Sequence, residues 1–200
     1  MSAMVRVAIV ADTHGQLDPR IAEVVAASDL AVHGGDIGNA AVLSALQPRS
    51  GRVLAVLGNN DVAHKWPSAD RHLLDELPLE VSEELPGGRL VVVHGHRTPA
   101  KDRHARLRRG FPDARAIVYG HSHRLVTDQD AEPWVLNPGA AGRERTHGGP
   151  SCMVLCAGHD HWALAVHRFP LVRSTARRGA VPSLSKGSPL RSETTVHRKA

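Results

Sequence analysis

The sequence predicts an α/β protein whose first third forms a parallel sheet. Three short apolar runs, residues 5–11, 30–36 and 52–57, are typical of buried strands. Segments with helical spacing of apolar residues connect them, and this alternation favours right-handed βαβ units. A length of 200 residues is enough for one domain with a substantial core.

Both connecting segments carry a helix start signal. Asp18 precedes Pro19, which is typical of an N-cap followed by proline at the first helical position. Asn39 is the expected cap of a second, shorter helix, which ends before Pro48.

The remainder of the chain predicts a less regular set of strands. We expect them at residues 79–85, 89–93, 116–119, 134–136, 151–157 and 161–169. The first two and the last two are separated by short glycine-containing turns, which is typical of hairpins. Residues 64–78 are expected to form a loop or a short helix, and residues 99–109 a basic helix with a solvated face.

The net charge of +5 belongs to the end of the chain. Residues 173–200 carry seven Lys or Arg and one acid, whereas residues 1–172 have a net charge of −1. We therefore expect a domain over residues 1–170 and a basic, disordered tail over residues 171–200. Weak contact of this tail with nucleic acid is one alternative, and a solvated tail is favoured because aromatic residues do not interleave its charges.

The composition also indicates the cellular compartment in which the protein is expected. Cys152 and Cys156 match no redox or zinc motif, and their even spacing predicts two buried, reduced thiols on one face of a strand. No apolar run reaches the length of a transmembrane segment. The first apolar run contains Arg6 and ends at Asp12, unlike a secretory signal. We expect a cytoplasmic protein.

Residues that bind metals follow five of the apolar runs. They are Asp12, His14, Asp36, Asn59, His94, His121 and His123. Since ligands of open α/β sheets bind beyond the carboxyl ends of the strands, we expect these side chains to converge on one rim. Histidine nitrogens and carboxylate oxygens together suit divalent transition metals. If the chain is extended at 12–14 and 121–123, both side chains of each pair point to one side.

Each of these motifs also has a simpler interpretation. Asp36 follows two glycines, and aspartate often only caps a turn or a helix in such a place. Isolated histidines such as His33, His72 and His104 are expected to be satisfied structurally rather than to bind metal. The joint occurrence of the motifs, each after a strand-like run, favours a metal site over a set of unrelated turns.

The motifs as a set resemble the five signature blocks of the calcineurin-like metallophosphoesterases. The blocks are Asp12-Thr13-His14, Gly35-Asp36, Gly58-Asn59-Asn60-Asp61, His94-Gly95-His96 and Gly120-His121-Ser122-His123. The short chain, the form of the third block and Asn137-Pro138-Gly139 resemble the small bacterial and archaeal phosphodiesterase branch. The resemblance covers about residues 5–169. It implies a two-sheet β-sandwich flanked by helices, the αββα metallophosphoesterase fold, with a dinuclear metal centre.

The resemblance also implies which residue binds which ion. Asp12, His14 and His123 would hold one metal, Asn59, His94 and His121 the second, and Asp36 would bridge them. The cofactors would be two divalent ions, manganese first, with iron, nickel, zinc or magnesium as alternatives. No ligand position is missing, which favours an enzyme over a binding protein such as the retromer scaffold subunit, whose similar fold has a degraded site.

The predicted function is that of a metal-dependent phosphodiesterase acting on a phosphate-ester substrate. Two cations about 3.5–4 Å apart can share a water, lower its pKa and supply a hydroxide that attacks phosphorus. A phosphomonoesterase and a non-catalytic scaffold or binding protein are the alternatives. The sequence leaves the oligomeric state open, with a homodimer as one alternative.

Three residues of these blocks are candidates for catalytic roles. Asn60 stands where many phosphatases of the superfamily carry a histidine that resembles a general acid, so substrates with good leaving groups should be favoured. His96 would substitute as proton donor or contact the substrate phosphate. Asp61 would orient a metal-bound histidine or the chain at Asn59, or would cap a turn.

Overall fold

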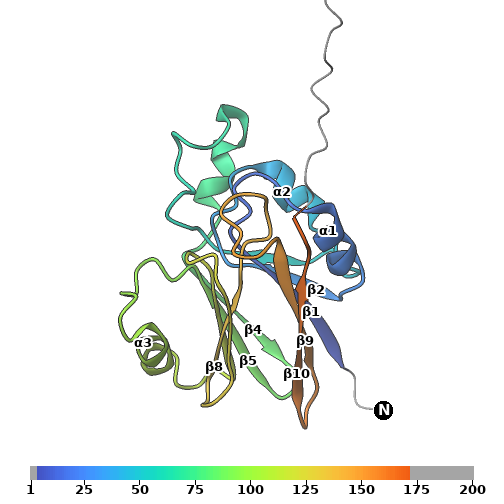
Figure 1. Cartoon of the computed structure of the whole chain (residues 1–200), viewed down its shortest axis with the longest axis vertical. Coiled ribbons are helices and arrows are strands. Elements are labelled where there is room, and N and C mark those ends of the chain that lie inside the picture. Colours follow the sequence, from blue (N-terminus) through green and yellow to red (C-terminus); the bar gives the residue numbers. More distant parts are fainter. Residues whose placement is uncertain (1–3, 172–200) are drawn as a thin grey trace, which may run out of the picture.

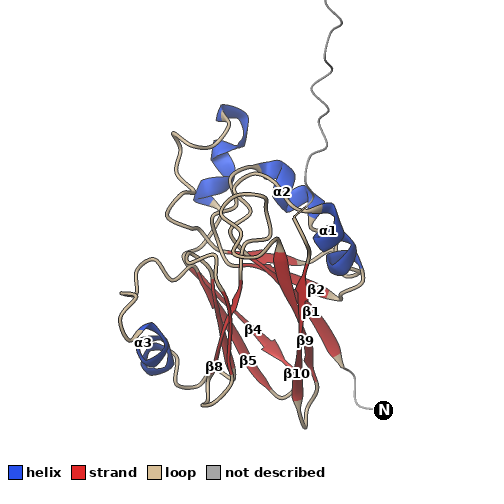
Figure 2. Cartoon of the chain, in the orientation of Figure 1, coloured by secondary structure: helices blue, strands red, loops and turns tan. Residues whose placement is uncertain are grey.

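The computed structural model describes residues 4–171, which form two five-stranded sheets packed face to face (Figures 1 and 2). The strand order is β10-β9-β1-β2-β3 in the first sheet and β4-β5-β6-β8-β7 in the second. Helices α1 and α2 lie beside the first sheet, and α3 lies beside the second. The expected two-sheet sandwich with flanking helices is confirmed.

The first sheet contains the predicted parallel unit. Its strands are β1 (Val5–Val10), β2 (Leu30–His33), β3 (Val53–Ala55), β9 (Ser151–Ala157) and β10 (Trp162–Arg168). β1, β2 and β3 are parallel, and β9 and β10 add an antiparallel hairpin at one edge. Helices α1 (Pro19–Ala26) and α2 (Ala40–Ala45) connect the parallel strands.

Both helices begin where the sequence predicts. The Asp18 side chain accepts a hydrogen bond from the backbone of Arg20, and the Asn39 side chain accepts one from the backbone of Val42, each 3.0 Å long. Each cap satisfies an N–H that has no partner inside its helix.

The second sheet is mixed. Its strands are β4 (Glu80–Leu85), β5 (Gly88–Val93), β6 (Ala116–Tyr119), β7 (Leu125–Asp128) and β8 (Trp134–Pro138). β5, β6 and β8 are parallel, whereas β4 and β7 run antiparallel at the two edges. A 3-10 helix, η1 (Ser68–Asp75), precedes β4, and α3 (Arg103–Gly110) connects β5 to β6.

Four details differ from the sequence prediction. β7 was not expected, because its four residues are only partly buried and carry no clear apolar pattern. β3 is shorter than residues 52–57, and α3 begins at Arg103 because Asp102 has a left-handed backbone with φ of 58°. Cys152 is buried as predicted, but Cys156 is half-buried, and its Sγ accepts a contact from the Arg6 guanidinium.

The main core lies between the two sheets. Val7, Ile9 and Val32 of the first sheet pack in one cluster with Leu90 and Val92 of the second, and all five are at most 1 % exposed. Strand alternation sends the intervening residues of β1 to the outer face, where they pack with α1. This packing fixes the two sheets relative to each other and therefore the strand ends.

Within residues 4–171, none of the helices has the length and apolar character needed to cross a bilayer. The expected basic tail, residues 171–200, lies outside the described residues except for Leu171.

Candidate metal centre

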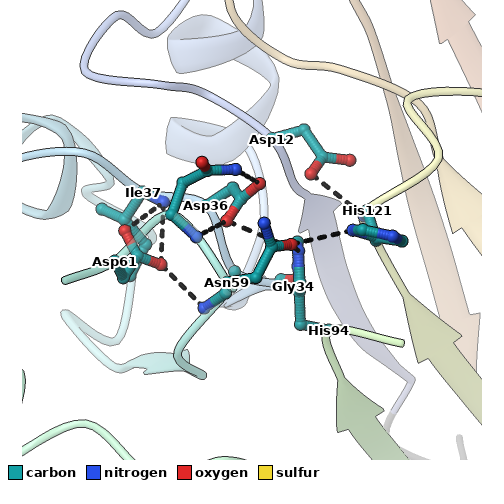
Figure 3. A network of polar contacts seen from close by, with 12 residues as sticks. Asp12, Gly34, Asp36, Ile37, Asn59, Asp61, His94 and His121 are labelled. Carbon is teal, nitrogen blue, oxygen red and sulfur yellow. Dashed lines mark hydrogen bonds and ion pairs between the residues drawn. The ribbon is translucent and has the colours of Figure 1, made fainter. Parts of the chain in front are cut away.

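The loops that follow five strands gather at one edge of the sandwich. β1, β2 and β3 of the first sheet and β5 and β6 of the second end there, and each is followed by a side chain named above as a candidate ligand. Figure 3 shows Asn59 lying between Asp36 and His121, with Asp12 and His94 close by, although these residues come from five separate loops. The structure thus brings together all seven side chains that the sequence pattern selected.

Four of the seven side chains form a first group. Asp12, His14, Asp36 and His123 each offer one donor atom, and these atoms lie within 4.8 Å of one another. The Nε2 atoms of His14 and His123 are 3.1 Å apart. His14 Nε2 is 3.8 Å from Asp36 Oδ2, and His123 Nε2 is 3.7 Å from Asp12 Oδ1.

The other three side chains form a second group on the far side of Asp36. Asn59 Oδ1 lies 3.1 Å from His94 Nε2 and 2.8 Å from His121 Nδ1. His94 Nε2 is also 3.4 Å from Asp36 Oδ1. Asp36 therefore turns one carboxylate oxygen to each group.

Left-handed backbone conformations are concentrated in these loops. Asp12, His14, Asp36, His121 and His123 all have φ between 47° and 68°. The condition considered above, an extended chain at residues 12–14 and 121–123, is therefore not met, and sharp turns present these side chains instead. Such conformations cost about 1–3 kcal/mol each and persist where the surroundings impose them, most often at functional sites.

Two glycines allow the loops to approach each other. A Cβ on Gly58 would lie 2.1 Å from Asp36 Oδ1, and a Cβ on Gly35 would lie 2.7 Å from His94 Nδ1. Gly35 also has φ of 88°, which L side chains rarely adopt. Gly35 and Gly58 are thus required by close contact with candidate ligands.

Asn60 holds the central carboxylate in place. Its backbone N–H donates to Asp36 Oδ1 over 2.8 Å, and its side-chain Nδ2 donates to Asp36 Oδ2 over 2.6 Å. The Lys65 ammonium donates to Asn60 Oδ1, which fixes the amide with its NH₂ group toward Asp36. Asn60 therefore contacts a candidate ligand as a hydrogen-bond donor.

Asp61 binds backbone rather than a histidine. Its carboxylate accepts a hydrogen bond from the Ile37 N–H (Figure 3) and further ones from the N–H groups of Gly38 and Gly58, all at 2.8–3.0 Å, and from Trp66 Nε1 at 3.0 Å. Of the three roles considered above, these contacts favour capping the turn at Gly58 and holding the chain beside Asn59 over orienting a histidine, and they extend to the loop after Asp36.

The sequence reasoning gave no role to Thr13 and expected no metal role for His33. His33 is fully buried, its Nδ1 accepts from Gly35 N–H over 3.2 Å, and its Nε2 lies 2.9 Å from Thr13 Oγ1. Thr13 Oγ1 in turn donates to the Ile37 carbonyl over 3.0 Å. This chain of contacts ties the Asp12 loop to the Asp36 loop. The only signal for these contacts in the local sequence was His33 itself, a polar residue at the end of an otherwise apolar strand.

His96 lies at the side of the centre. Its ring centroid is 5.3 Å from that of His94, and its buried Nδ1 has no hydrogen-bond partner in the described part of the chain. It also lines a cavity of about 200 Å³ that continues to Leu79 and Phe111. This position is close to the second group but outside it.

Burial dominates the electrostatics of the centre. It raises the pKa of Asp12 to about 7, and the charge of His94 only partly opposes it. Burial also lowers the pKa of His14, and it lowers that of His123 to about 4, so both rings are neutral near pH 7. Burial alone would raise the pKa of Asp36, but contacts with His94 and Asn60 outweigh it and hold this pKa below its ordinary range.

The residues of the first group fit a divalent cation. Asp12 Oδ2 is buried and has no hydrogen-bond partner among the described residues, an arrangement that is costly unless something else satisfies it. Two neutral imidazoles direct nitrogen atoms toward the same space, and ligands of one ion bound at about 2.0–2.2 Å lie roughly 3–3.5 Å apart. Nitrogen and carboxylate oxygen together are a donor set for manganese, iron, nickel or zinc.

The raised pKa of Asp12 leads to a prediction for the metal-free protein. The folded pKa of about 7 exceeds the ordinary 3.8, so Asp12 favours the metal-free fold at low pH. This contribution is lost as the pH rises through 7. We expect the ¹³C resonance of the Asp12 carboxyl group to titrate near pH 7, and added metal to release this proton. Titration at the ordinary pKa of an aspartate would contradict the prediction.

Comparison with known proteins agrees with this geometry. The sequence model of the calcineurin-like phosphoesterase superfamily domain matches residues 5–165. Phosphodiesterase MJ0936 of Methanocaldococcus jannaschii is 23 % identical over 145 residues, which cover 67 % of this chain and 82 % of that protein.

Solved structures share the fold. Vps29 of Entamoeba histolytica matches with a TM-score of 0.64 and 16 % identity, over 82 % of this chain and 99 % of that one. A predicted phosphoesterase of Streptococcus pneumoniae matches with a TM-score of 0.59 and 20 % identity, over 84 % and 91 %. A protein described as a novel archaeal phosphodiesterase matches with a TM-score of 0.59 and 20 % identity, over 81 % and 99 %. With its five motif-bearing loops at one edge of a two-sheet sandwich, the chain belongs to the calcineurin-like phosphoesterase superfamily.

Proposed function

We propose that this protein is a metal-dependent phosphodiesterase with a dinuclear centre. The observation that carries the proposal is the position of Asp36, whose two carboxylate oxygens face two separate groups of nitrogen and oxygen donors. Membership of a phosphoesterase superfamily and similarity to a protein named as a phosphodiesterase support hydrolysis of phosphate esters.

The ligand assignment follows the two groups. Asp12, His14 and His123 bind one ion, Asn59, His94 and His121 bind the other, and Asp36 is shared. Manganese is the ion that we expect first, because the set mixes imidazole with carboxylate and amide oxygens. When bound, a pair of divalent ions lowers the pKa of a shared water and so supplies a nucleophile near neutral pH.

The remaining residues act on the ligands and on the substrate. Asn60 orients Asp36 through two hydrogen bonds, and its amide does not give up a proton at neutral pH. Esters with good leaving groups are therefore the favoured substrates, unless His96 protonates the leaving oxygen. His96 has a buried nitrogen without a partner and lies beside His94, which suits either this role or contact with the phosphate.

The test is a metal-reconstitution assay. Protein stripped of metal with a chelator and then reloaded with manganese should hydrolyse bis-p-nitrophenyl phosphate, and the stripped protein should not. The metal content of the active sample should approach two ions per chain. A reloaded protein that binds metal and hydrolyses no phosphate ester would overturn the proposal.

The same assay distinguishes two alternative functions from the proposed one. A phosphomonoesterase would prefer p-nitrophenyl phosphate to the diester. A scaffold protein would show no turnover, whether or not it bound metal. The similarity of the fold to Vps29 is the observation that favours this second candidate. The complete set of candidate ligands favours the enzyme.

A further inference from the structure

Arg145 reaches the first group from a loop that none of the five signature blocks includes. The loop connects β8 to β9, and the Arg145 side chain is exposed at its tip. One guanidinium nitrogen, Nη2, lies 3.1 Å from Nε2 of His14. This nitrogen of His14 also faces His123, so Arg145 stands directly at the mouth of the first group.

The loop is fixed to the metal-centre loops at its base. The Ala141 N–H donates to the Ala11 carbonyl over 2.9 Å, and the Asp18 N–H donates to the Ala141 carbonyl over 3.0 Å. A Cβ on Gly142 would lie 2.3 Å from the Thr13 carbonyl oxygen, so the two loops are in close contact.

The backbone of Arg145 has the same unusual conformation as the candidate ligands. Its φ is 51°, and in the described part of the chain only seven non-glycine residues have positive φ. Five of these are candidate ligands. Strained backbone of this kind persists where surrounding contacts impose it and is concentrated at functional sites.

The charge of Arg145 is not neutralised by an ion pair with any carboxylate of residues 4–171. The positive charge of Arg145 instead lowers the pKa of histidines in the first group. After burial, which is the largest cause, the Arg145 guanidinium is the next to lower the pKa of His123, and it also contributes to the lowered pKa of His14. An unpaired guanidinium beside a metal centre is suited to an anion.

We propose that Arg145 binds a non-bridging oxygen of the substrate phosphoryl group, which rests on the proposed function. The Nε2 atom of His14 has a single lone pair. It cannot serve a metal ion and the Arg145 N–H together, so binding of the ion frees the guanidinium. The freed side chain remains at the mouth of the centre, where its fork of N–H donors matches the oxygens of a phosphoryl group.

If Arg145 has this role, its removal should change the affinities for metal and for phosphate in opposite directions. Arg145 places a positive charge and a competing donor at His14, so its removal should strengthen metal binding in the absence of substrate. The same removal should weaken phosphate binding to the metal-loaded protein. A residue that only supports the loop would lower both affinities.

The experiment compares Arg145→Ala and Arg145→Lys with Arg143→Ala, an exposed arginine of the same loop, as the matched control. Calorimetry measures Mn²⁺ binding to the stripped proteins and inorganic phosphate binding to the loaded proteins, and steady-state kinetics follow with bis-p-nitrophenyl phosphate. For Arg145→Ala we expect Mn²⁺ affinity to rise about 2- to 10-fold, since one nearby charge and one hydrogen bond are lost. Phosphate affinity and kcat/KM should each fall about 10- to 100-fold, the range for a hydrogen bond to a charged group.

The variants separate charge from geometry. Arg145→Lys should keep the Mn²⁺ affinity of the wild type and recover phosphate affinity in part, because it retains the charge without the fork. Arg143→Ala should match the wild type in all three measurements.

Unchanged phosphate affinity in Arg145→Ala, or weaker Mn²⁺ binding, would overturn the inference, as would a metal-loaded wild type that binds no phosphate. Failure of the proposed function is distinguishable. If the proposed function were wrong, the wild-type protein would show no turnover. The measurements of Mn²⁺ and phosphate binding would still decide the role of Arg145.

Discussion

Replacing Asp36 with asparagine is expected to abolish dinuclear metal binding and turnover together. Asp36 is the one side chain that faces both donor groups, with Oδ2 toward His14 and Oδ1 toward His94. In the proposed centre two cations would share the negative charge of Asp36, and the substitution removes this charge and turns one ligand oxygen into an NH₂ group. Because loss of one group that stabilises transition-state charge costs roughly 10²–10³-fold in kcat, we expect a loss of about 10³-fold or more in kcat/KM.

The fold should tolerate this change. Asp36 has φ of 57°, and asparagine is among the few residues that accept this left-handed conformation. Asparagine also has the size of aspartate, so the contact with Gly58 is preserved, and only one of the two hydrogen bonds that Asn60 donates to Asp36 loses its acceptor. The effect should therefore be on metal and rate, with a circular dichroism spectrum like that of the wild type.

The measurements are metal content by elemental analysis and kcat/KM with a diester substrate. Asp102→Asn is a matched control, because Asp102 has φ of 58° and is exposed, away from the seven candidate ligands. It should retain full metal content and rate. An Asp36→Asn protein with two ions per chain and an unchanged rate would refute the shared-ligand role.

The sequence predicted the strand ends well because their signal is local. An apolar run stops where the chain leaves the core, and a polar residue placed there is at the edge of the sheet. Asp36 and His94 are clear cases. Each follows a buried strand, and each is only 1 % exposed. The caps Asp18 and Asn39 were predictable for the same reason, since a cap bonds to a backbone group two or three residues away.

The contacts between loops were not predictable, because they depend on how two sheets pack. The carboxylate of Asp61 binds the backbone of Ile37, 24 residues earlier in the chain. The guanidinium of Arg145 meets His14 across 131 residues. Neither pairing leaves a periodic trace in the sequence. The left-handed turns at the candidate ligands were missed for a related reason. Aspartate and histidine adopt φ above zero more often than most residues, but tertiary contacts decide at which positions they do so.

Removing the side chain of Asp61 is expected to be the most destabilising single substitution among the loops of the centre. The carboxylate is 5 % exposed and accepts four hydrogen bonds at 2.8–3.0 Å, from the backbones of Ile37, Gly38 and Gly58 and from Trp66 Nε1. In Asp61→Ala these donors lose their acceptor in a buried place. One unsatisfied buried donor costs about 1–3 kcal/mol, and because neighbouring losses are not additive we expect about 3–5 kcal/mol in the free energy of unfolding.

A cost of this size is a large share of the total stability of a domain, which is about 5–15 kcal/mol. Urea unfolding of the metal-free protein measures it. Asp61→Asn keeps one carbonyl oxygen as acceptor, so we expect an intermediate loss. Asp70→Ala is the control, because Asp70 accepts a single hydrogen bond from the backbone of Ala40, over 3.0 Å, and its loss should cost about 1 kcal/mol.

Substitution of Asp61 should also weaken metal binding, although Asp61 does not contact a candidate ligand side chain. Asp61 holds the residues that follow Asp36 and the glycine that precedes Asn59, and in the described part of the chain none of its hydrogen bonds goes to a histidine. The Mn²⁺ affinity of Asp61→Asn should therefore fall by about 10- to 100-fold, the range for residues that support metal ligands. A variant as stable as the wild type and with equal Mn²⁺ affinity would show that these loops keep their shape without the carboxylate. The strain at Asp36 would then have to be sustained by its other contacts, among them those with Asn60, Gly58 and the His14 N–H.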